Sequence, residues 1–472
     1  MIWLVDDKNL ISPVKALLDI YGVYGETDEV LENSAESEII SRDTHFISIF
    51  KKADKTVIKV RKSDAVLEEK TFESLYSDSR ILSVLRAIYD FLGEEVPSFR
   101  KSYGLLTGIR PVKLFNYLAK LCGEEAAQKI FKEKYLVSDE KTAFIKTVHD
   151  IQLRYLDSFQ GTYGIYINIP FCPGRCSYCS FYSEELEKSR KWLEPYVDAL
   201  CRELETKKAY LGDKPVTAVY VGGGTPGVLE EPHINKLFDC LYQSVDIEKL
   251  LEISFEMGRA DTFTREKLIL LKAYGVNRIS VNPQSLNEQT LRRIGRKGTL
   301  REFEAAYYMA QEFGFDINTD MINGLEGESL TDMLHTLEGL ISMRPEAITV
   351  HTLAVKRGSK LIQTFDGSKF APGYYAKAQS VLNQELAANG YRPYYMYRQK
   401  HSLDNGENIG YCQNGKASIY NMGMMDSLQN IIGIGAGSSS KLLTNSKISK
   451  RLQNPKDIRG YINSMNSKQE IL

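Results

Sequence analysis

The chain has 472 residues, of which 43% are hydrophobic and 26% are charged, a composition typical of folded globular proteins and not of disordered chains. A chain of this length favours two or three domains. Its 60 Lys and Arg residues are balanced by 61 Asp and Glu residues, so the composition gives no electrostatic footprint for nucleic acid or for an anionic membrane.

The N-terminus, MIWLVDDKNL, lacks the basic and then apolar pattern of a signal peptide. No apolar run reaches the roughly 18 residues of a membrane span. Seven cysteines, three of them crowded together, do not resemble a disulfide framework. We therefore expect a cytoplasmic protein with no membrane span and no nucleic-acid partner. Outside the crowded group we expect the cysteines to be helix-packing or loop residues: Cys122, Cys201, Cys240 and Cys412.

Residues 1–160 differ in pattern from the rest of the chain. The alternating segments HFISIF and TVIKVR flank the polar turn KKADK and predict a β-hairpin. Helical periodicity follows in ILSVLRAIYDFLG, in PVKLFNYLAKLCG and over residues 141–156. Pro111 at the first helical position and Gly123 at the end are typical helix start and stop signals. We expect an N-terminal α+β extension over residues 1–160.

From Tyr163 onward, short apolar runs alternate with amphipathic helical stretches. The runs are YGIYINI, VTAVYVG, LEISFEM, VNRISVN, DINTDMI and AITVHTL. Six strand–helix units predict parallel strands joined by helical crossovers. Since six is fewer than the eight units of a closed barrel, we expect an α/β fold: an open partial (β/α)6 TIM-like barrel over residues 161–364. Ligands of such sheets bind at the carboxyl ends of the strands.

After residue 364 the strand–helix alternation stops. A helical stretch, YYAKAQSVLNQELAANG, and glycine-rich segments follow. We expect a mainly helical C-terminal cap over residues 365–472.

Three cysteines come directly after the first apolar run, in the order Cys172-Pro-Gly-Arg-Cys176-Ser-Tyr-Cys179. Three thiolates in one short loop can bind three irons of a [4Fe–4S] cubane and leave the fourth iron open. An open iron can chelate the amino and carboxylate groups of S-adenosylmethionine (SAM) and pass an electron to its sulfonium. The alternative, a structural zinc site, needs a fourth ligand, and no Cys or His lies between Cys179 and Cys201. The sequence therefore favours an iron–sulfur cluster.

A glycine run, Gly222-Gly223-Gly224 followed by Thr225, ends the second apolar run. Glycines at a strand end let backbone N–H and C=O groups approach a ligand closely. Alone, such a run is usually only a turn. Because it follows the strand after the cysteine loop, we interpret it as a binder for the amino group of SAM.

Polar residues lie at the ends of the next three runs, where a plain core strand would stay apolar. Glu256 ends the third run, Gln284 follows the fourth, and Asp320 lies in the fifth. A carboxylate suits the ribose hydroxyls of a nucleoside, and Arg296, on the loop after the fourth unit, suits the carboxylate of SAM. Any one of these could be a solvent-facing strand end. Together, at the same end of successive units as the cysteines, they indicate one site.

Five stretches carry a family resemblance: YINIPFCPGRCSYC, GGGTP, EISFE, GVNRISVNPQS and DINTDMINGLEG. In order and spacing, over about residues 163–360, they resemble the radical SAM enzymes of the oxygen-independent coproporphyrinogen III oxidase group. A weaker similarity continues in IIGIGAGSSS. The N-terminal extension and the segment YGLLTGIRPVKL resemble the coproporphyrinogen dehydrogenase branch of that group.

The resemblance implies a partial barrel that binds one [4Fe–4S] cluster and SAM. It implies a 5′-deoxyadenosyl radical that takes hydrogen from propionate side chains of coproporphyrinogen III, followed by loss of CO₂ and one electron to give the vinyls of protoporphyrinogen IX. It also implies an anaerobic, haem-biosynthetic enzyme with a reducing electron donor such as flavodoxin or ferredoxin, and no catalytic acid or base. The SAM contacts that it implies are Tyr166, Tyr178, Gly223, Gly224, Thr225, Glu256, Gln284, Arg296, Asp320 and Ala354.

Three features depart from the family pattern. Asn168 stands where the family usually has a histidine, the cluster motif ends Cys179-Ser180-Phe181 instead of Cys-Gly-Cys, and an Arg- and Tyr-rich N-terminal segment is missing. These departures leave the cluster and SAM positions intact. They concern the identity of the substrate, because they set this chain apart from the enzymes that act on coproporphyrinogen.

A second hypothesis is therefore a haem-binding chaperone or carrier, which resembles a sister group of the same family. His351 could then be an axial haem ligand, although a hydrogen-bonded barrel histidine is the favoured interpretation. If the tetrapyrrole is a substrate, its carboxylates need cationic partners, and the candidates are Arg110, Lys113, Arg259, Lys356 and Arg357.

Overall fold

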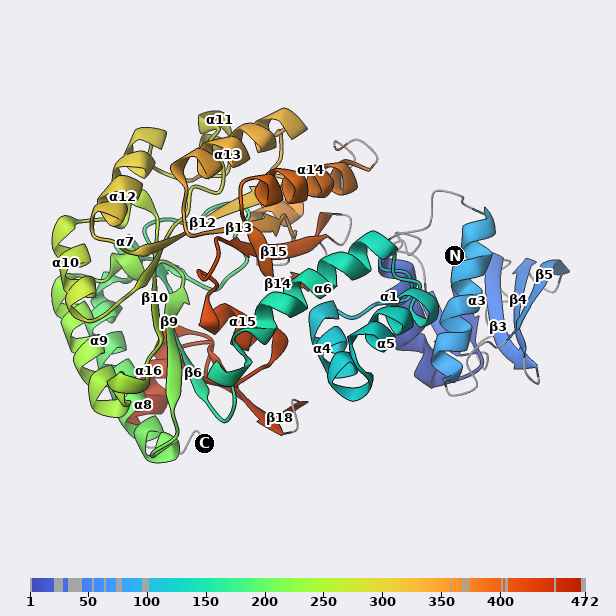
Figure 1. Cartoon of the computed structure of the whole chain (residues 1–472), viewed down its shortest axis with the longest axis horizontal. Helices are drawn as coiled ribbons and strands as arrows, with labels where there is room; N and C mark the ends of the chain where they lie inside the picture. Colours follow the sequence, from blue (N-terminus) through green and yellow to red (C-terminus); the bar gives the residue numbers. More distant parts are fainter. Residues whose placement is uncertain are drawn as a thin grey trace. The chain divides into compact units, whose positions relative to one another are not determined.

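The computed structural model describes residues 2–20, 29–32, 45–52, 55–62, 65–73, 79–95, 102–356, 358–366, 370, 373–399, 402–403, 406–444 and 447–467. The chain divides into two units, Met1–Lys146 and Thr147–Leu472. Figure 1 shows both units with their helices and strands labelled.

The first unit is built on a five-stranded sheet in the order β2-β1-β3-β4-β5. β3 and β4 pair antiparallel with Ile49 opposite Ile58, which confirms the predicted hairpin. The helices α1 and α3 pack on this sheet and bury Leu17 and Ile88 together with both isoleucines. The strands are β1 (Ile2–Val5), β2 (Glu29–Glu32), β3 (His45–Lys52), β4 (Lys55–Lys62) and β5 (Ala65–Glu73), and the helices are α1 (Ile11–Ile20) and α3 (Arg80–Glu95).

The remaining helices of this part follow the predicted pattern. α4 (Pro111–Cys122) begins at its proline and stops before Gly123, whose backbone N–H donates to Ala119 O. Gly123 has φ +86°, a conformation that glycine adopts without strain. α5 (Glu124–Lys129) and α6 (Asp139–Leu153) follow. The helices predicted from residue 111 and over residues 141–156 are thus confirmed within a few residues.

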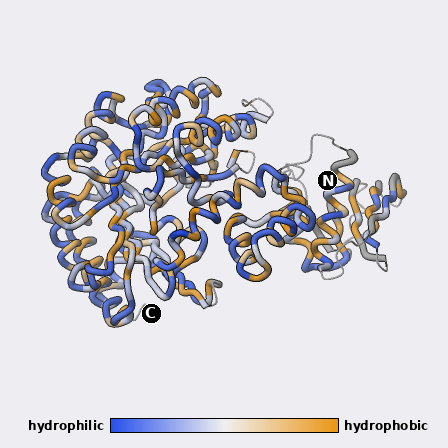
Figure 2. The backbone as a smooth tube through the Cα atoms, viewed as in Figure 1, coloured by the Kyte–Doolittle hydropathy of each residue, from blue (hydrophilic) through white to orange (hydrophobic). Residues whose placement is uncertain are grey.

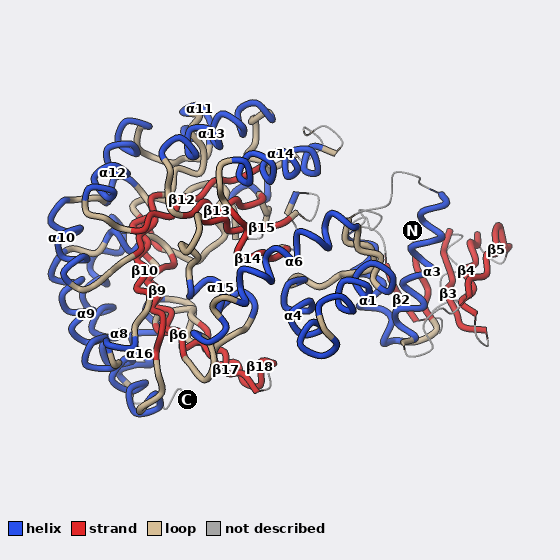
Figure 3. The backbone as a smooth tube through the Cα atoms, viewed as in Figure 1, coloured by secondary structure: helices blue, strands red, loops and turns tan. Residues whose placement is uncertain are grey.

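The second unit contains an eleven-stranded sheet in the order β14-β15-β13-β12-β11-β10-β9-β6-β16-β17-β18. Its six central strands are the six predicted apolar runs, adjacent in chain order and paired in parallel. The expectation of an open partial barrel is thereby confirmed, and Figure 3 shows these strands surrounded by helices. The strands are β6 (Tyr163–Ile169), β9 (Val216–Gly223), β10 (Glu252–Gly258), β11 (Arg278–Val281), β12 (Asp316–Asn323) and β13 (Ala347–Thr352).

The crossover helices alternate hydrophobic and hydrophilic residues along their length (Figure 2). On α8, Tyr196, Leu200 and Leu204 recur at helical spacing and are buried. α13 begins with a capping box between Ser329 and Asp332. No helix in the described ranges is long and apolar enough to cross a membrane. The crossover helices are α8 (Leu193–Leu211), α9 (Glu231–Ser244), α10 (Arg265–Ala273), α11 (Glu288–Arg293), α12 (Leu300–Glu312) and α13 (Leu330–Met343).

The C-terminal part differs from the expected mainly helical cap, because it also supplies five strands to the large sheet. β15 pairs antiparallel with β13, and β16 pairs parallel with β6. These strands have five to seven residues, within the range of the central strands, but their segments lack the regular strand–helix alternation that identified the central ones. The elements are α14 (Tyr374–Ala388), β14 (Arg392–Arg398), β15 (Glu407–Cys412), α15 (Ile419–Asp426), β16 (Asn430–Ile434), β17 (Ser439–Thr444), β18 (Lys447–Gln453) and α16 (Ile458–Asn466).

Two of the scattered cysteines also differ from expectation. Cys201 on α8 and Cys240 on α9 form a disulfide, with their Cα atoms 5.4 Å apart. The two helices follow neighbouring strands and pack side by side, which brings together residues 39 positions apart in the chain. The expectation of packing residues without a bond between them is wrong for this pair, whereas Cys122 and Cys412 are free thiols.

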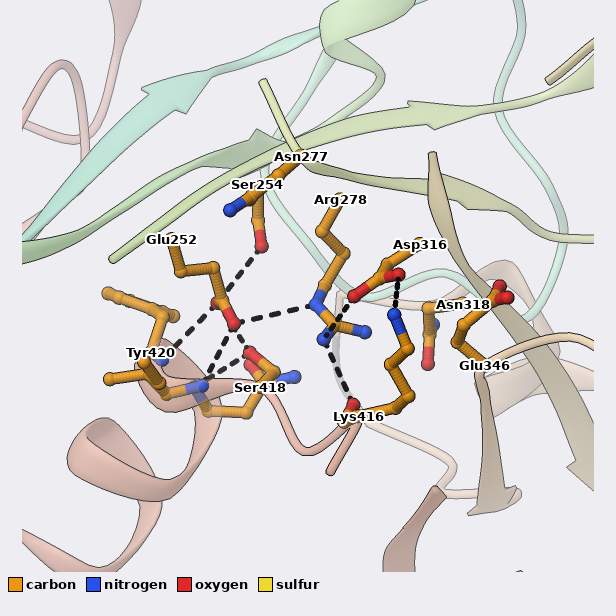
Figure 4. A network of polar contacts seen from close by, with 12 residues as sticks. Glu252, Ser254, Asn277, Arg278, Asp316, Asn318, Glu346, Lys416, Ser418 and Tyr420 are labelled. Carbon is orange, nitrogen blue, oxygen red and sulfur yellow. Dashed lines mark hydrogen bonds and ion pairs between the residues drawn. The ribbon is translucent and has the colours of Figure 1, made fainter. Parts of the chain in front are cut away.

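A network of charged residues closes the barrel at the amino ends of its strands (Figure 4). The Glu252 carboxylate accepts hydrogen bonds from Ser418 Oγ at 2.7 Å and from the backbone N–H of Ile419 at 2.9 Å, at the start of α15. Arg278 Nε lies 3.4 Å from the same carboxylate, and Arg278 Nη2 lies 3.6 Å from Asp316. Burial of the Arg278 charge therefore depends on its two carboxylates.

We expect Glu252→Gln to lower the free energy of unfolding of the second unit by about 3–5 kcal/mol, because it leaves the buried Arg278 charge with one distant carboxylate. Urea unfolding followed by tyrosine fluorescence and circular dichroism measures the change. Glu312→Gln is the matched control, since its ion pair with Arg265 has both side chains more than half exposed and should cost at most about 1 kcal/mol. Equal losses in the two variants would contradict the prediction.

Candidate active site

The cysteine loop leaves the carboxyl end of β6 and is held on both sides. β7 (Phe171–Cys172) pairs with β8 (Glu184–Glu185), which places Cys172 beside Glu185. The backbone N–H of Ser177 donates to Ile294 O at 2.9 Å, and Ser177 O accepts from Ser359 Oγ at 2.9 Å. The loop that carries all three cysteines is therefore tied to the segments after α11 and β13.

The glycine run of β9 lies directly against this loop. The N–H of Gly224 donates to Ile169 O at 2.9 Å, and the N–H of Thr225 donates to Phe171 O at 2.8 Å. A Cβ at Gly224 would lie 2.6 Å from Phe171 O and 3.0 Å from Cys172 Sγ, so any larger residue would occupy the space beside the sulfur. Thr225 Oγ1 lies 3.5 Å from Cys172 Sγ.

Two arginines place positive charge beside the cysteine loop. Arg259 is 4% exposed, donates to both oxygens of Asp261 at 2.8 and 2.9 Å, and reaches Gly174 O at 3.4 Å. Burial lowers the pKa of Arg259, but the charges of Asp261 and of the thiols raise it overall. Arg296 Nη2 donates to Gly258 O at 2.9 Å, and its Nη1 lies 4.0 Å from Cys176 Sγ. Cationic side chains beside the thiols favour an anionic metal–thiolate group there.

Glu256 is the most strongly perturbed carboxylate near the loop. Its Oε1 accepts a hydrogen bond from Tyr220 Oη, and its Oε2 accepts one from the backbone N–H of Gly223 at 3.1 Å. Burial raises the pKa of Glu256 to about 7, and these two hydrogen bonds oppose the rise. A Cβ at Gly222 would lie 2.8 Å from Glu256 Oε2. The glycine run thus leaves room for this carboxylate as well as for the cysteine loop.

Asp320 and His351 form a second polar pair in the barrel interior. Asp320 Oδ1 accepts from Asn318 Nδ2 at 2.7 Å, and Asp320 Oδ2 lies 3.7 Å from His351 Nε2. Burial lowers the pKa of His351, but Asp320 and the hydrogen bond with Asn408 raise it above its ordinary value overall.

The proton on His351 is located by Asn408. Asn408 Oδ1 lies 3.2 Å from His351 Nδ1 and also accepts from the backbone N–H of Thr352 at 3.2 Å. Because this oxygen can only accept, Nδ1 carries a proton and Nε2 faces the Asp320 carboxylate. These contacts agree with the hydrogen-bonded barrel histidine that the sequence favoured.

Gln284 has an unusual backbone conformation. Its φ is +72°, in the left-handed region that residues other than glycine rarely adopt. Its N–H donates to Asp320 O, and its carbonyl accepts from the N–H of Ile322, both at 3.0 Å. These two hydrogen bonds to β12 keep Gln284 in its strained backbone conformation. Backbone strain of this kind is found most often at functional sites.

The two tyrosines that the resemblance assigned to SAM lie in different surroundings. Tyr166 stacks with Tyr220 at 6.3 Å between ring centroids and with Tyr420 at 6.2 Å. Its hydroxyl donates to Asn168 Oδ1 at 3.2 Å, and burial raises its pKa. Tyr178 packs against a group of buried aliphatic side chains that includes Leu291.

The remaining candidates are spread over the chain. Ala354 follows β13 and bridges to Ser402. Lys356 lies close by, and burial lowers its pKa. Arg357 lies outside the described residues. Arg110 and Lys113 belong to the first unit. Arg259, proposed from sequence as a partner for substrate carboxylates, is instead bound to Asp261 and the cysteine loop.

Sequence reasoning missed Tyr220 and Asn408. Tyr220 could have been found, because it lies two residues before Gly222 and strand alternation places both on one face of β9. Asn408 lies on β15, a strand that was not predicted, so no sequence signal pointed to it.

The residues present fit a cluster and SAM. The thiols lie close enough for the charges of Cys172 and Cys176 to raise the pKa of the Cys179 thiol, although burial contributes most. Gly224 leaves space beside Cys172, and Arg259 and Arg296 offer compensating charge. Glu256 and Asp320 offer carboxylates to the polar groups of a nucleoside and an amino acid.

We expect separate Ala substitutions of Cys172, Cys176 and Cys179 each to abolish stable cluster binding, because each removes a thiolate ligand. Iron and sulfide analysis with visible absorption of anaerobically reconstituted protein measures the effect. Cys122→Ala is the control, since Cys122 is an exposed free thiol, and it should bind the cluster as the unsubstituted protein does. A triple variant that keeps its cluster would show that the ligands lie elsewhere.

Known proteins share these features. Residues 166–340 match the Radical SAM superfamily model. The chain is 35% identical over 395 residues to the oxygen-independent coproporphyrinogen-III oxidase-like protein HemZ of Bacillus subtilis, covering 81% of this chain and 78% of that protein. It is 31% identical over 193 residues to the heme chaperone HemW of Escherichia coli, covering 41% of this chain and 50% of that protein.

A solved structure shares the fold. The radical SAM enzyme coproporphyrinogen III oxidase HemN from Escherichia coli superposes with a TM-score of 0.54 at 20% identity, covering 67% of this chain and 73% of that chain. Since the similarity to HemZ extends over most of both proteins, the chain belongs to the radical SAM superfamily, in the oxygen-independent coproporphyrinogen III oxidase-like family, whose members bind a [4Fe–4S] cluster and SAM.

Proposed function

We propose that this chain is an oxidoreductase that converts propionate side chains of coproporphyrinogen III into the vinyls of protoporphyrinogen IX, without oxygen, in haem biosynthesis. The observation that carries the proposal is the meeting of the cysteine loop, the glycine run and two half-buried carboxylates at the carboxyl edge of one parallel sheet. The similarity to HemZ over most of the chain supports a tetrapyrrole as the molecule acted on.

In this proposal Cys172, Cys176 and Cys179 bind three irons of the cluster, which leaves one iron for SAM. When bound, the reduced cluster and SAM together supply a carbon radical that can take hydrogen from an unactivated carbon. Arg259 holds the loop through Gly174 O, so the ligands keep their positions. The loop is also tied to the segments on either side, which favours a site that does not rearrange when the cluster is reduced.

The SAM contacts are proposed from the same geometry. Glu256 and the backbone of the glycine run suit the amino group, because the run contacts Glu256 at Gly223 and Cys172 at Gly224. Arg296 suits the carboxylate. Asp320, oriented by Asn318 and His351, suits the ribose hydroxyls. Tyr166, Tyr178, Gln284 and Ala354 would complete the enclosure of the nucleoside.

The proposed reaction needs no acid or base from the chain. Each propionate loses one hydrogen atom, carbon dioxide and one electron to become a vinyl, so the overall change requires an electron acceptor. A reducing donor such as flavodoxin or ferredoxin would deliver the electron that starts each SAM cleavage. The chain's part is to bind, to orient and to exclude water.

A second candidate is a haem carrier that keeps the cluster and SAM site. The similarity to HemW, a heme chaperone, favours it; that similarity covers 50% of the Escherichia coli protein and, at 26% identity, 75% of the protein of Buchnera aphidicola subsp. Acyrthosiphon pisum. The ending Cys179-Ser180-Phe181 also differs from the Cys-Gly-Cys of the oxidases.

Turnover separates the two candidates. Anaerobically reconstituted protein with SAM, a reductant and an electron acceptor should convert coproporphyrinogen III into a vinyl product, detected by mass spectrometry as the loss of two carboxyl groups. The Cys172→Ala variant is the control and should give none. Failure to form the product, together with stoichiometric haem binding by the same preparation, would favour the carrier and overturn the decarboxylase.

SAM affinity should depend on pH through Glu256. Burial raises the pKa of this group to about 7, so its negative charge is lost as the pH falls through that value. Because the charged form accepts a hydrogen bond from the SAM amino group more strongly than the neutral form does, affinity should fall by up to about tenfold per pH unit below that pKa. Equilibrium dialysis of the cluster-loaded protein on both sides of pH 7 measures this.

Glu256→Gln is the matched variant, and its weaker SAM binding should no longer change over this range. His351 and Asp320 also face Glu256, and the pKa of His351 is raised above its ordinary value. A variant profile as steep as that of the unsubstituted protein would therefore assign the titration to another group.

A further inference from the structure

The middle of the barrel is lined by small polar side chains. Ser254, Ser280 and Asn318 come from the neighbouring strands β10, β11 and β12. Interiors of such barrels are usually filled by large branched side chains such as Val, Ile and Leu. Here the smaller side chains leave a cavity of about 20 Å³ between the charged network at the amino ends and Glu256 at the carboxyl ends. A polar cavity of this size has room for one or two water molecules.

Side chains from the C-terminal part also line this cavity. Tyr394 of β14 is buried, and Asn421 of α15 donates from Nδ2 to the Tyr394 hydroxyl at 3.4 Å. Tyr220 and Glu256, which are hydrogen-bonded to each other, line it as well. The cavity therefore extends from the buried Tyr394 to the carboxylate that we assign to SAM.

Arg278 brings a hydrogen-bond donor without a partner to this cavity. It is one of the lining residues and is 6% exposed. Its Nη2 donates to Lys416 O at 2.9 Å and lies 3.6 Å from Asp316, while its Nε lies 3.4 Å from Glu252 (Figure 4). Its other terminal nitrogen, Nη1, is buried and has no hydrogen-bond partner among the described residues. A buried guanidinium N–H without an acceptor is costly, so this nitrogen calls for a ligand in the cavity.

The charges around Arg278 decide which kind of ligand fits. Glu252 and Asp316 are paired with Arg278 and Lys416, so two carboxylates balance two cations. An added anion would be repelled by these carboxylates and by Glu256, and an added cation would be repelled by the guanidinium. A neutral molecule that both donates and accepts hydrogen bonds avoids both penalties. Water is such a molecule, and it occupies polar cavities whereas apolar cavities of similar size stay dry.

The cavity walls offer the acceptors that such a water needs. Ser280 Oγ accepts one long hydrogen bond, from Asn282 Nδ2 at 3.4 Å, and Ser254 Oγ donates its own hydrogen at 3.0 Å. A hydroxyl oxygen has two lone pairs and a carboxylate oxygen also accepts two hydrogen bonds, so both serines and Glu256 keep acceptor capacity. Buried waters typically make about three hydrogen bonds, and this cavity provides one charged donor and several acceptors.

We propose that this cavity is a water site that connects the Arg278 guanidinium with the hydrogen-bonded pair of Tyr220 and Glu256. One or two waters accept from Arg278 Nη1 and donate to the serine hydroxyls and to the Glu256 carboxylate. The charge network at the amino ends of the strands is thereby linked to the carboxylate at their carboxyl ends. The water site itself does not depend on the proposed function, whereas its effect on SAM binding rests on it.

Three substitutions of one wall residue test the water site. Ser280→Ala removes a hydroxyl and leaves the cavity open, Ser280→Val fills the cavity with a methyl group, and Ser280→Thr has the size of Val but keeps a hydroxyl. If water occupies the cavity, Val displaces it and leaves Arg278 Nη1 without an acceptor. The melting temperature of Ser280→Val, followed by circular dichroism, should then lie about 3–10 °C below that of Ser280→Ala, with Ser280→Thr in between.

Other outcomes contradict the water site. A dry cavity gains packing when it is filled, so Ser280→Val would melt above Ser280→Ala. Equal losses in Ser280→Val and Ser280→Thr would assign the effect to steric overpacking. A crystal structure of the full chain should show ordered water within hydrogen-bond distance of Arg278 Nη1, and none there in Ser280→Val. An anomalous peak at this place after bromide exchange would show that the cavity binds an anion instead.

SAM binding by the cluster-loaded protein tests the link to Glu256. A water that donates to this carboxylate favours its charged form, so Ser280→Val should bind SAM about threefold to tenfold more weakly than Ser280→Ala near pH 7. At pH 9 Glu256 is charged in both variants and the affinities should agree. The other groups that face Glu256 are the same in both variants: Tyr220, Asp320 and His351.

Equal SAM affinities of the two variants near pH 7 would overturn the link between the water site and Glu256. The melting temperatures and the ordered waters are measured without SAM. Failure of the unsubstituted protein to bind SAM, or to form a vinyl product, would therefore count against the proposed function and not against the water site.

Discussion

Parallel pairing of the six strands β6 and β9 to β13 is the constraint on which the rest of the structure depends. Each strand runs in the same direction as its neighbour, so all six carboxyl ends meet at one edge of the sheet. Residues from four different strand–helix units lie at this edge because parallel pairing puts the carboxyl ends of their strands there. They are Cys172, Gly224, Glu256 and Asp320.

Because side chains alternate between the two faces of a strand, several polar residues point into the barrel. Their charges are balanced in different ways at the two ends of the barrel. At the amino ends, the carboxylates of Glu252 and Asp316 are paired with Arg278 and Lys416, so the charges balance. At the carboxyl ends, Glu256 makes no ion pair with another described residue, and burial raises its pKa to about 7. The amino end is therefore built for stability, whereas the carboxyl end keeps a carboxylate that a cationic ligand would stabilise.

The C-terminal part is a structural component of the site and not a separate cover. β16 pairs with β6, the strand that leads into the cysteine loop. β15 supplies Asn408, whose Oδ1 lies 3.2 Å from His351 Nδ1, while His351 Nε2 lies 3.7 Å from Asp320. The segment around Ser359 holds the cysteine loop from the other side. In the loop pinned in this way, Cys176 is buried, whereas Cys172 and Cys179 are partly exposed.

The sequence by itself determined the six central strands, the place of the cysteine loop at the end of the first of them, and the carboxylates at the strand ends. These are local signals: apolar runs, helix caps and three closely spaced cysteines. Only the tertiary structure decided that Arg259 holds the loop, that Cys201 meets Cys240 and that the C-terminal segments are strands. Each of these depends on a partner far along the chain, and a short run such as β16 becomes a strand because β6 offers it hydrogen bonds.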